Sequence, residues 1–469
     1  MLSQLDLRNY RCFEKISLNL HKQMTVLVAA NGAGKTSILD ALAVALGPYV
    51  GAFDEGSGPH FGPADIRLFR VRDTASNEME YAAEGVRLDA YGFIPGSLED
   101  GLDETLKTHW SRSLAGPVKA KTTIKDAKQL ANYGKRMQAA VRTPGERVCL
   151  PLLAYYGTGR LWQQKRLTET KKKIQRTSRT VAYTDCLDPA SSYKSFVEWF
   201  RYWSFNTKDL LFKGLSQSEA YQEYAACLAS VTRAVDICLA PAGWSGLEYD
   251  FGSDALVVHH PAYGVLMVDQ LSDGIRNMIG MVADIAFRAT KLNAYLGARA
   301  AQETPGIVLI DEVDMHLHPE WQQVVLQQLQ AAFPKIQFVV TTHSPQVLTS
   351  VDKACIRVLR QRVDPDTGDS TRLVEGVDMQ TRGVSSADLL ARIMGVNPVP
   401  NVLEARQLSE YHALIQQNLY ESSEGQILRA QLNGHFGADH PLMQDCERMI
   451  RLQAFKQRLP RQLGRGEGC

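Results

Sequence analysis

The sequence predicts an α/β fold whose central sheet is interrupted by a long insertion. Near the N-terminus, the β-branched run Met24–Val28 precedes a loop of small residues and a segment with helical spacing from 36 to 43. A second apolar run, Ile307–Ile310, lies far downstream and ends in two carboxylates. Short apolar strands that alternate with helices are typical of a parallel sheet. Both runs therefore fit one buried sheet whose halves are separated in sequence.

Length and composition indicate a soluble protein with a sizeable core. The chain has 469 residues, of which 45% are hydrophobic, enough for two or three structural units. Its longest apolar runs fall short of the roughly 20 residues that a membrane span needs, so we expect no transmembrane helix. The N-terminus alternates polar and apolar residues, which indicates a first strand and a cytoplasmic protein. Eight cysteines occur without a CxxC spacing, so we expect reduced thiols and neither zinc nor disulfides.

The element order divides the chain into four parts. We expect residues 1–110 and 246–376 to form the two halves of the sheet domain, residues 111–245 a basic and mostly helical insertion, and residues 377–469 a helical C-terminal extension. Within these parts, we predict a loop over Gly47–Pro63, strands between Glu78 and Pro95, a return strand at 151–156, aromatic-rich helices from Ser191 to Ala240, strands or hairpins over Leu247–Val268, a helix over His318–Phe333, and a strand pair at Ile356–Leu359 and Thr371–Val374.

The loop after Met24–Val28 has the spacing of a phosphate-binding loop. Glycines let the backbone approach an anion closely, and the following helix N-terminus presents free N–H groups to it. Lys35 should reach the β and γ phosphates of a nucleotide, and Thr36 should ligate Mg²⁺. Ala29 replaces the usual first glycine, which a negative φ would tolerate. The candidate nucleotide-binding residues here are Asn31, Gly32, Ala33, Gly34, Lys35, Thr36 and Ser37.

Three further polar residues follow the downstream strands. Because the carboxyl ends of parallel strands meet at the edge where ligands bind, Asp311 and Glu312 should lie beside the phosphate loop. Asp311 is the predicted holder of Mg²⁺, and Glu312 the general base that orients the attacking water. His343 follows the next strand, Phe338–Thr342, and should contact the γ-phosphate. The predicted catalytic residues are thus Glu312, His343 and Lys35, with ATP and Mg²⁺ as cofactors.

The string Leu271–Asn277 opens a helix and completes a recognisable set of motifs. Together with the phosphate loop, the carboxylate pair and the histidine, it resembles the signature motif of ABC-type ATPase heads, with Asp273 and Ile275 as departures. Leu7–Phe13 resembles the N-terminal motif of the RecF, OLD and SMC group. That resemblance implies that Asn9 and Arg11 lie near the nucleotide.

The same resemblance implies that ATP is sandwiched between two subunits. Ser272 and Gly274 would then contact the γ-phosphate held by a second copy, and residues 314–319 would form the D-loop that crosses the interface. His316 and His318 could instead bind a metal, although no third ligand lies nearby in sequence. We find no clear Gln-loop residue; Gln163 and Gln164 are weak candidates.

The overall layout resembles PtuA-type ATPases of Septu and retron-associated antiphage modules. The resemblance rests on residues 155–160, on the string Asp-Glu-x-Asp-x-His-Leu-His-Pro from Asp311 and on the helical C-terminal part. It implies a head homodimer or a higher oligomer, a partner nuclease of the HNH type similar to PtuB, and a reverse transcriptase with its RNA or DNA product as a further partner. The ATPase would gate the separate nuclease.

The basic stretch is the strongest charge asymmetry in the chain. Between Ser111 and Thr180 there are 17 Lys or Arg and three acidic residues, although the whole chain has a net charge of +1. Such a cluster can contact a nucleic-acid backbone without reading sequence; a solvated helical arm or a surface for an acidic partner is the alternative. The candidate nucleic-acid residues are Lys165, Arg166, Lys171, Lys172, Lys173 and Arg176.

Three function classes are compatible with these motifs. A regulatory ATPase that controls a nuclease is favoured, and a RecF-like ATPase that acts directly on DNA in repair is the alternative. An OLD-like enzyme would need its own Toprim nuclease, but the single Asp-x-Asp after Asp311, Asp364-Pro365-Asp366, lies in an evident turn. We therefore expect no intrinsic nuclease. A transporter subunit is disfavoured because the insertion is too long and too basic.

Overall fold

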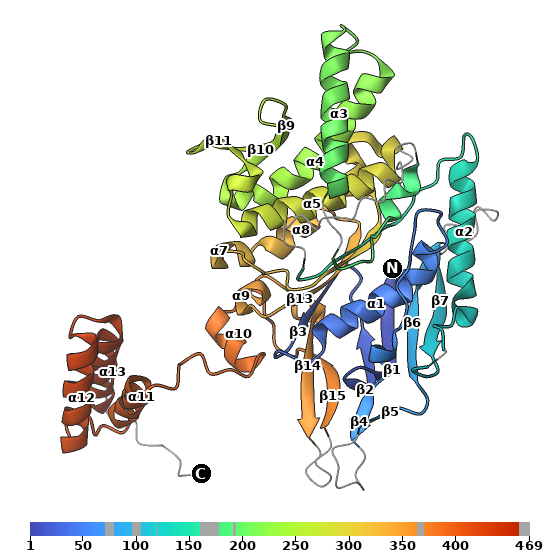
Figure 1. Cartoon of the computed structure of the whole chain (residues 1–469). Helices are drawn as coiled ribbons and strands as arrows, with labels where there is room; N and C mark the ends of the chain where they lie inside the picture. Colours follow the sequence, from blue (N-terminus) through green and yellow to red (C-terminus); the bar gives the residue numbers. More distant parts are fainter. Residues whose placement is uncertain are drawn as a thin grey trace, which may run out of the picture. The chain divides into compact units, whose positions relative to one another are not determined.

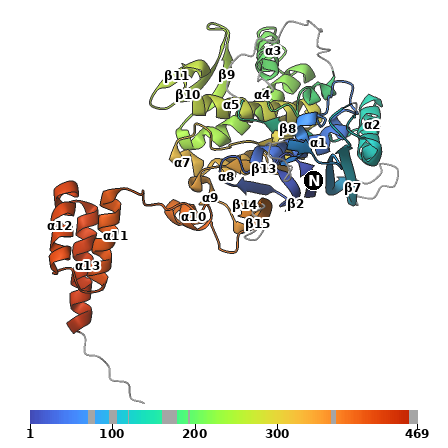
Figure 2. The same ribbon diagram turned by 60° about the horizontal axis from the view of Figure 1, so that its bottom comes forward.

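The computed structural model describes residues 1–70, 79–95, 105–118, 120–159, 178–190, 194–363 and 370–458. The chain forms two compact units, Met1–Met394 and Gly395–Cys469, which are shown in Figures 1 and 2. The predicted boundary at residue 377 thus lies inside the larger unit. The predicted boundary at residue 110 falls within a strand, β7, described below.

A six-stranded sheet forms the centre of the larger unit. Its strand order is β15-β14-β3-β13-β12-β8, and all neighbours are parallel except β14 and β15. Ile310 of β12 pairs with Val340 and with Tyr156, so three strands end together at one edge. The strands span Leu152–Tyr156 (β8), Gly306–Ile310 (β12), Ile336–Thr342 (β13), Met24–Val28 (β3), Ile356–Val363 (β14) and Ser370–Gly376 (β15).

An antiparallel sheet of order β2-β1-β6-β7 packs on the other side of helix α1. Helix α1 contacts β12 and β13 of the central sheet and β6 and β7 of this one, so it is buried along most of its length. The elements are β1 (Leu2–Tyr10), β2 (Phe13–Asn19), α1 (Lys35–Val50), β6 (Val86–Pro95) and β7 (Thr105–Leu114); a short hairpin joins β4 (Leu68–Arg70) and β5 (Met79–Tyr81).

The predicted loop over Gly47–Pro63 is present only from residue 51, and its predicted start was wrong, because α1 continues through Gly47 and Pro48 to Val50. A proline inside a helix cannot donate to the carbonyl four residues earlier, here Val44, and normally breaks the helix. Arg112 on β7 supplies the missing donor, since its Nη1 lies 3.0 Å from the Val44 oxygen. A residue far away in sequence therefore permits the proline, which no local pattern could show.

Helices cover the remaining face of the central sheet and build the insertion. The predicted return strand is β8, which pairs directly with β12. The predicted helix over His318–Phe333 is divided into two shorter helices. The helices are α2 (Lys128–Arg142), α3 (Lys194–Phe212), α4 (Glu219–Leu239), α5 (Asp273–Leu292), α6 (Ala300–Glu303), α7 (Pro319–Gln322), α8 (Val325–Ala332), α9 (Pro345–Leu348) and α10 (Ser386–Arg392); a three-stranded sheet joins β9 (Ser245–Asp250), β10 (Ala255–His260) and β11 (Gly264–Met267).

One helix among the described residues, Glu219–Ala242, is long and apolar enough to span a membrane. This segment contains α4, which packs against α3, α5, α8 and β9 within the larger unit. Cys227, Val231, Val235 and Leu239 of α4 are buried there. These contacts are those of a core helix, because they pair its apolar positions with protein rather than with an open surface.

The smaller unit is a bundle of three helices, α11 (Leu403–Gln416), α12 (Ser423–Phe436) and α13 (Pro441–Arg458). It has a separate apolar core, to which each helix contributes; its buried members are Tyr411, Ile415, Leu428, Leu432, Met443 and Cys446. Serine at the N-cap of α12 accepts a hydrogen bond from Gly425, which satisfies one of the free N–H groups at the helix start. The predicted helical character of the C-terminal part is therefore present in this unit.

Candidate functional site

The phosphate loop between β3 and α1 has the backbone that an anion-binding loop needs. Gly32 and Gly34 adopt positive φ values of 74° and 102°, which side chains strongly disfavour. A Cβ atom on Gly34 would lie 2.5 Å from the Phe13 ring and 2.7 Å from the Cys12 sulfur. Ala29 is not among the described residues with a positive φ, so the missing first glycine needs no special conformation.

The side chains predicted to hold phosphate and metal meet at one edge of the sheet. The Thr36 hydroxyl donates to Asp311 Oδ2 over 2.7 Å. Lys35 Nζ donates to the carbonyls of Ala29 (3.0 Å) and Ala30 (3.4 Å) within the loop. Burial lowers the pKa of Lys35, while the Asp311 carboxylate opposes this shift. Hydroxyl and carboxylate oxygens side by side form a donor set that suits Mg²⁺.

Glu312 and His343 complete the same cavity. A cavity of about 540 Å³ is lined by Arg11, Cys12, Asn31, Gly32, Gly34, Lys35, Thr36, Ser37, Asp311, Glu312 and His343; we call it the nucleotide pocket. Glu312 has a φ of 48°, an uncommon conformation for a residue with a side chain and one that concentrates at active sites. Burial lowers the pKa of His343 below its usual 6.5, and the Lys35 ammonium adds to this shift.

Arg11 reaches the nucleotide pocket from the turn between β1 and β2. Its guanidinium bonds Asp40 of α1 (2.5 Å) and Asp65 (2.8 Å), and Tyr155 of β8 donates to the other Asp40 oxygen over 2.9 Å. Asn9 and Ala33 do not line the pocket. Asn9 instead has a φ of 52° and accepts a hydrogen bond from the Arg67 amide over 2.8 Å through its own carbonyl, so it shapes the turn that presents Arg11.

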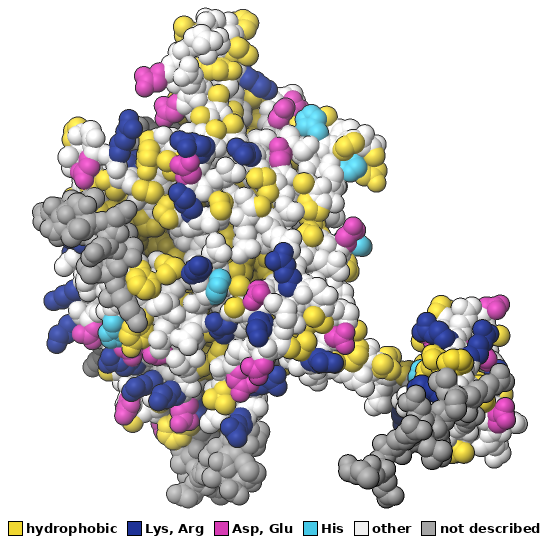
Figure 3. Space-filling model, turned by 180° about the vertical axis from the view of Figure 1, so that it is seen from behind, with side chains coloured by type: hydrophobic (Ala, Val, Ile, Leu, Met, Phe, Trp, Pro, Cys, Tyr) yellow, Lys and Arg dark blue, Asp and Glu magenta, His cyan; other side chains and the backbone are white. Residues whose placement is uncertain are grey.

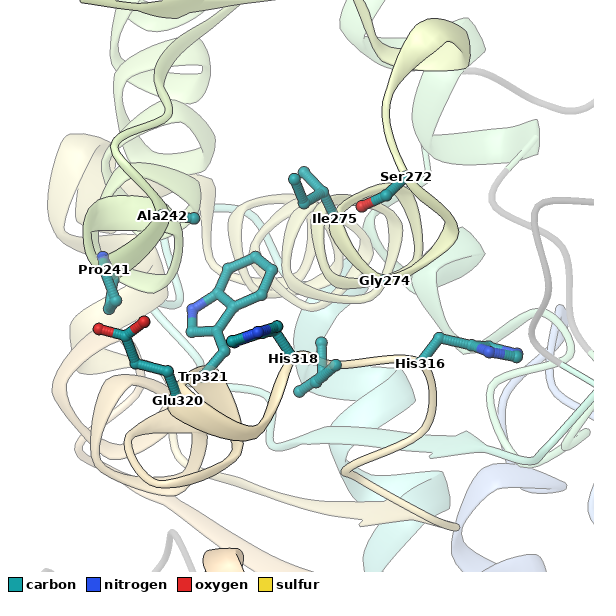
Figure 4. A pocket seen from close by; sticks show the side chains of 10 residues that line it. Pro241, Ala242, Ser272, Gly274, Ile275, His316, His318, Glu320 and Trp321 are labelled. Atoms are coloured by element: carbon teal, nitrogen blue, oxygen red, sulfur yellow. The ribbon is translucent and has the colours of Figure 1, made fainter. Parts of the chain in front are cut away.

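A second cavity lies at the start of α5. It has about 530 Å³ and is lined by Pro241, Ala242, Ser272, Gly274, Ile275, His316, Leu317, His318, Glu320 and Trp321 (Figure 4); we call it the signature pocket. Ser272 is the N-cap residue of α5, as predicted, but its hydroxyl makes no capping hydrogen bond. A serine at this position usually bonds an amide of the first turn, whereas the Ser272 hydroxyl makes no such bond and Asp273 is the acidic residue of that turn.

The predicted D-loop packs directly on the signature segment. A Cβ atom on Gly274 would lie 2.2 Å from the His316 carbonyl oxygen, so only glycine permits this contact. His316 has a φ of 61°. The Thr342 hydroxyl donates a hydrogen bond to Asp314 Oδ1 over 2.6 Å. His316 and His318 line the signature pocket, but the described residues contain no group of three ligand-type side chains placed to bind a metal.

The structure adds residues that the sequence did not single out. Thr341 donates to Asp311 Oδ1 over 2.6 Å and accepts from the Glu312 amide over 2.8 Å, so one hydroxyl orients both carboxylate residues. Arg372 on β15 donates to the carbonyls of Cys12 (3.2 Å) and Gly32 (3.3 Å) at the rim of the nucleotide pocket. The Thr341-Thr342 pair before His343 was a usable signal, whereas nothing near Arg372 marks it in sequence.

Several predicted positions lie outside the described residues. They include all six of the candidate nucleic-acid residues, Lys165, Arg166, Lys171, Lys172, Lys173 and Arg176, together with Gln163, Gln164 and Asp364-Pro365-Asp366. The segment that carries the first eight begins directly after β8 and its following turn. Tyr156 of β8 pairs with Ile310, so β8 itself ends at the edge of the sheet that carries Asp311.

Two family models and several known proteins are similar to this chain in sequence. A family described as "AAA domain" matches residues 4–224, and one described as "AAA domain, putative AbiEii toxin, Type IV TA system" matches residues 215–349. The chain is 27% identical to the retron Ec83 probable ATPase of Escherichia coli, over 93% of this chain and 84% of that protein. It is 26% identical to the Septu protein PtuA of Bacillus thuringiensis, over 36% of this chain and 41% of that protein.

A solved structure covers much of the chain at low identity. The Smc head domain from Pyrococcus furiosus with an extended coiled coil, bound to the C-terminal domain of ScpA, matches 80% of this chain and 96% of its own length. The sequence identity is 16% and the TM-score 0.44.

Proposed function

We propose that this chain, an ABC-type ATPase related to the retron Ec83 ATPase and to Septu protein PtuA, works as an ATP-switched head dimer that regulates a partner nuclease in antiphage defence. ATP would close two heads on each other, and hydrolysis would let them separate. The state of the heads would decide whether the nuclease acts.

One observation supports the proposal of a dimer: the nucleotide pocket and the signature pocket share no lining residue. In this proposal, Ser272 and the N-terminus of α5 bind the γ-phosphate of the nucleotide held by a second copy, since the nucleotide pocket of the same chain is lined by other residues. A two-fold dimer places the same two patches opposite each other twice. Each nucleotide would thus lie between the phosphate loop of one copy and the Ser272 and Gly274 segment of the other.

Within one copy, the residues of the nucleotide pocket have distinct roles in this proposal. Lys35 turns from the Ala29 and Ala30 carbonyls to the β and γ phosphates. Thr36 and Asp311, already 2.7 Å apart, hold Mg²⁺, whose charge balances that of the phosphates. Arg11 lies at the rim as a further cation for the phosphates, fixed by Asp40 and Asp65.

Glu312 and His343 handle the attacking water. Glu312 accepts a proton from the water as general base, and Thr341 holds its backbone in place. His343, whose lowered pKa keeps its ring neutral at pH 7, has one ring nitrogen free to accept a hydrogen bond from the water or to donate one to the γ-phosphate. Removal of bulk water by the second head would strengthen all of these interactions.

The partner assignments follow from the resemblance and the charge pattern. An HNH-type nuclease similar to PtuB is the proposed effector, and a reverse transcriptase with its RNA or DNA product is a further component. Nucleic acid is the proposed signal, because the sequence that follows β8 is rich in Lys and Arg and such cations suit a phosphate backbone. The end of β8 pairs with Ile310, the residue before Asp311.

Co-expression with the neighbouring genes tests this function. We expect a stable complex with a nuclease and protection of cells against phage, and we expect Lys35→Ala to abolish protection while the complex still forms. A protein that purifies alone and stimulates strand exchange would instead support a RecF-like role in DNA repair and would sink the defence assignment.

A further inference from the structure

Helix α2 carries a row of cations on its exposed face. Lys128, Lys135 and Arg136 are exposed, and so are Gln129 and Asn132 between them. Spacings of three, four and seven residues place these side chains on one side of the helix. The helix lies at the outer edge of the larger unit beside β7 (Figure 1). We call this face the α2 stripe.

The α2 stripe has few acidic neighbours in sequence. Between Lys121 and Arg142 the sequence contains one carboxylate, Asp126. Among the ion pairs of the described residues, the only α2 cation is Arg142, which pairs with Asp54. On the face of the molecule shown in Figure 3, Lys and Arg side chains are interspersed with Asp and Glu side chains and with apolar and uncharged surface. The stripe is therefore a local concentration of charge rather than part of a general positive face.

We propose that the α2 stripe contacts the phosphate backbone of a nucleic acid. Lys128 and Arg136 are eight positions apart, which is about 12 Å along a helix. A nucleic-acid strand advances about 3.4 Å per phosphate, so this length matches about three phosphates. Gln129 and Asn132 add amide donors, the type of group that contacts phosphates and sugars without reading bases. Lys121 and Lys125 extend the exposed cations toward the start of the helix.

An acidic protein fits the stripe less well. Protein interfaces need a core of aromatic or large apolar side chains. Within the described residues, no member of α2 is among the exposed large hydrophobic side chains. Charge and hydrogen-bond donors without apolar anchors suit a polyanion whose contacts are mainly electrostatic.

The opposite face of α2 connects the stripe to the phosphate loop. Tyr133 packs on Tyr49 of α1 with ring centroids 5.6 Å apart, and a Cβ atom on Gly134 would lie 2.8 Å from the Tyr49 carbonyl oxygen. Helix α1 begins with Lys35. A nucleic acid bound to α2 would thus contact a helix that packs directly on α1, whose first residues are the proposed phosphate ligands. We therefore expect the nucleic acid to change the rate of ATP hydrolysis.

The proposal rests on nucleic-acid sensing by the proposed defence ATPase and specifies a surface for it. The test compares a triple variant, Lys128→Gln, Lys135→Gln and Arg136→Gln, with a control that removes three exposed cations from other elements, Lys15→Gln, Lys22→Gln and Lys335→Gln. Fluorescence anisotropy would measure binding of labelled single-stranded DNA, duplex DNA and single-stranded RNA of mixed sequence over a range of salt concentrations. ATP turnover would be measured with and without each probe.

We expect the α2 variant to bind at least about tenfold more weakly, with the slope of log K against log salt for duplex DNA reduced by about 2 to 3. Its turnover without nucleic acid should equal that of the wild type, which also reports correct folding. The double variant Lys128→Gln, Lys135→Gln should show a smaller loss. Unchanged binding by the α2 variant would disprove the proposal that the α2 stripe contacts nucleic acid. The basic residues that follow β8 in sequence would then be the remaining candidates. Failure of the wild type to bind any probe would overturn sensing itself.

Discussion

The two pockets of the larger unit differ in how complete they are. The nucleotide pocket brings together two cations, two hydroxyls, two carboxylates and an imidazole from four segments of the chain, all within one cavity. The signature pocket contains Ser272 at the N-terminus of α5, whose hydroxyl makes no capping hydrogen bond, but no residue of the phosphate loop lines it. The first pocket has the residues for chemistry, whereas the second has a helix start but neither the lysine nor the two carboxylates of the first.

Backbone conformation is constrained in both pockets. At the nucleotide pocket, Arg11 and Glu312 hold positive φ values of 47° and 48°, which cost free energy and persist only where surrounding contacts fix them. At the signature pocket, His316 has a φ of 61°, and Gly274 lies against the His316 carbonyl. The pockets thus differ in the side chains that line them rather than in the strain of their backbones.

The largest effect should come from Lys35→Ala, which removes the cation of the phosphate loop from the nucleotide pocket. Loss of a preorganised charge at a phosphate costs about 100-fold or more in turnover. We also expect weaker ATP binding, since Lys35 would contact the bound phosphates. Turnover assays and calorimetric titration with ATP would measure both. Lys15→Ala, an exposed lysine on β2, is the matched control, and near-normal turnover of Lys35→Ala would disprove its role.

Glu312→Gln should separate binding from chemistry. The amide keeps the shape of the side chain but cannot take a proton, so turnover should fall by about 100-fold to 10,000-fold. ATP should still bind and should hold the heads closed. Size-exclusion chromatography with light scattering should then show a stable dimer of the Glu312→Gln variant in the presence of ATP. The wild type should return to monomers as it hydrolyses the ATP. Turnover at the wild-type rate would show that another residue is the base.

A mixing experiment tests whether the two pockets work across subunits. Ser272→Arg should inactivate the signature pocket, and Lys35→Ala the nucleotide pocket, so each variant alone should be inactive. In a mixed dimer, one composite site contains neither change. Random mixing should therefore restore about a quarter of the wild-type turnover per protomer. If both pockets acted within one chain, every protomer in the mixture would carry a defect and no activity would return.

Thr341→Val should have a smaller effect, because Thr341 acts through its neighbours. The substitution leaves Asp311 without a hydrogen bond of 2.6 Å and the Glu312 amide without its acceptor. Loss of such a supporting contact typically costs about 10-fold to 100-fold in metal affinity or activity. We expect a higher Mg²⁺ requirement, measured by titrating Mg²⁺ at fixed ATP. Thr341→Ser should restore most of the activity, whereas equal Mg²⁺ curves for valine and wild type would exclude this role.

The sequence predicted the parts of the site that lie in short motifs and missed those set by distant contacts. Thr36 and Asp311 were expected to meet because parallel strands end at a common edge, and they lie within hydrogen-bonding distance. The helical conformation of Pro48 could not be predicted from the sequence. The Val44 carbonyl that Pro48 leaves without a donor is bonded instead by Arg112, whose position depends on the pairing of another sheet. Arg372 was missed for the same reason, because β15 is distant from the phosphate loop in sequence and the fold alone brings its side chain to the Gly32 carbonyl.

The smallest effect concerns the pH dependence of the nucleotide pocket. Burial and the nearby Lys35 ammonium both disfavour a charged His343, so its pKa lies below 6.5. The ring is then neutral at pH 7 and gains a proton only in more acidic solution, where it can no longer accept a hydrogen bond. We expect kcat/KM, which reports the free enzyme, to fall below pH 6.5 as His343 becomes protonated.

ATP itself titrates near this range, since the terminal phosphate has a pKa of about 6. The informative quantity is therefore the ratio of wild type to His343→Gln at each pH, in which the contribution of the substrate cancels. That ratio should be constant above pH 7 and should decline toward acid, because only the wild type loses an acceptor there. A ratio that changes above pH 7 instead would mean that the histidine is charged in the resting pocket, and that Lys35 does not lie close enough to suppress its protonation.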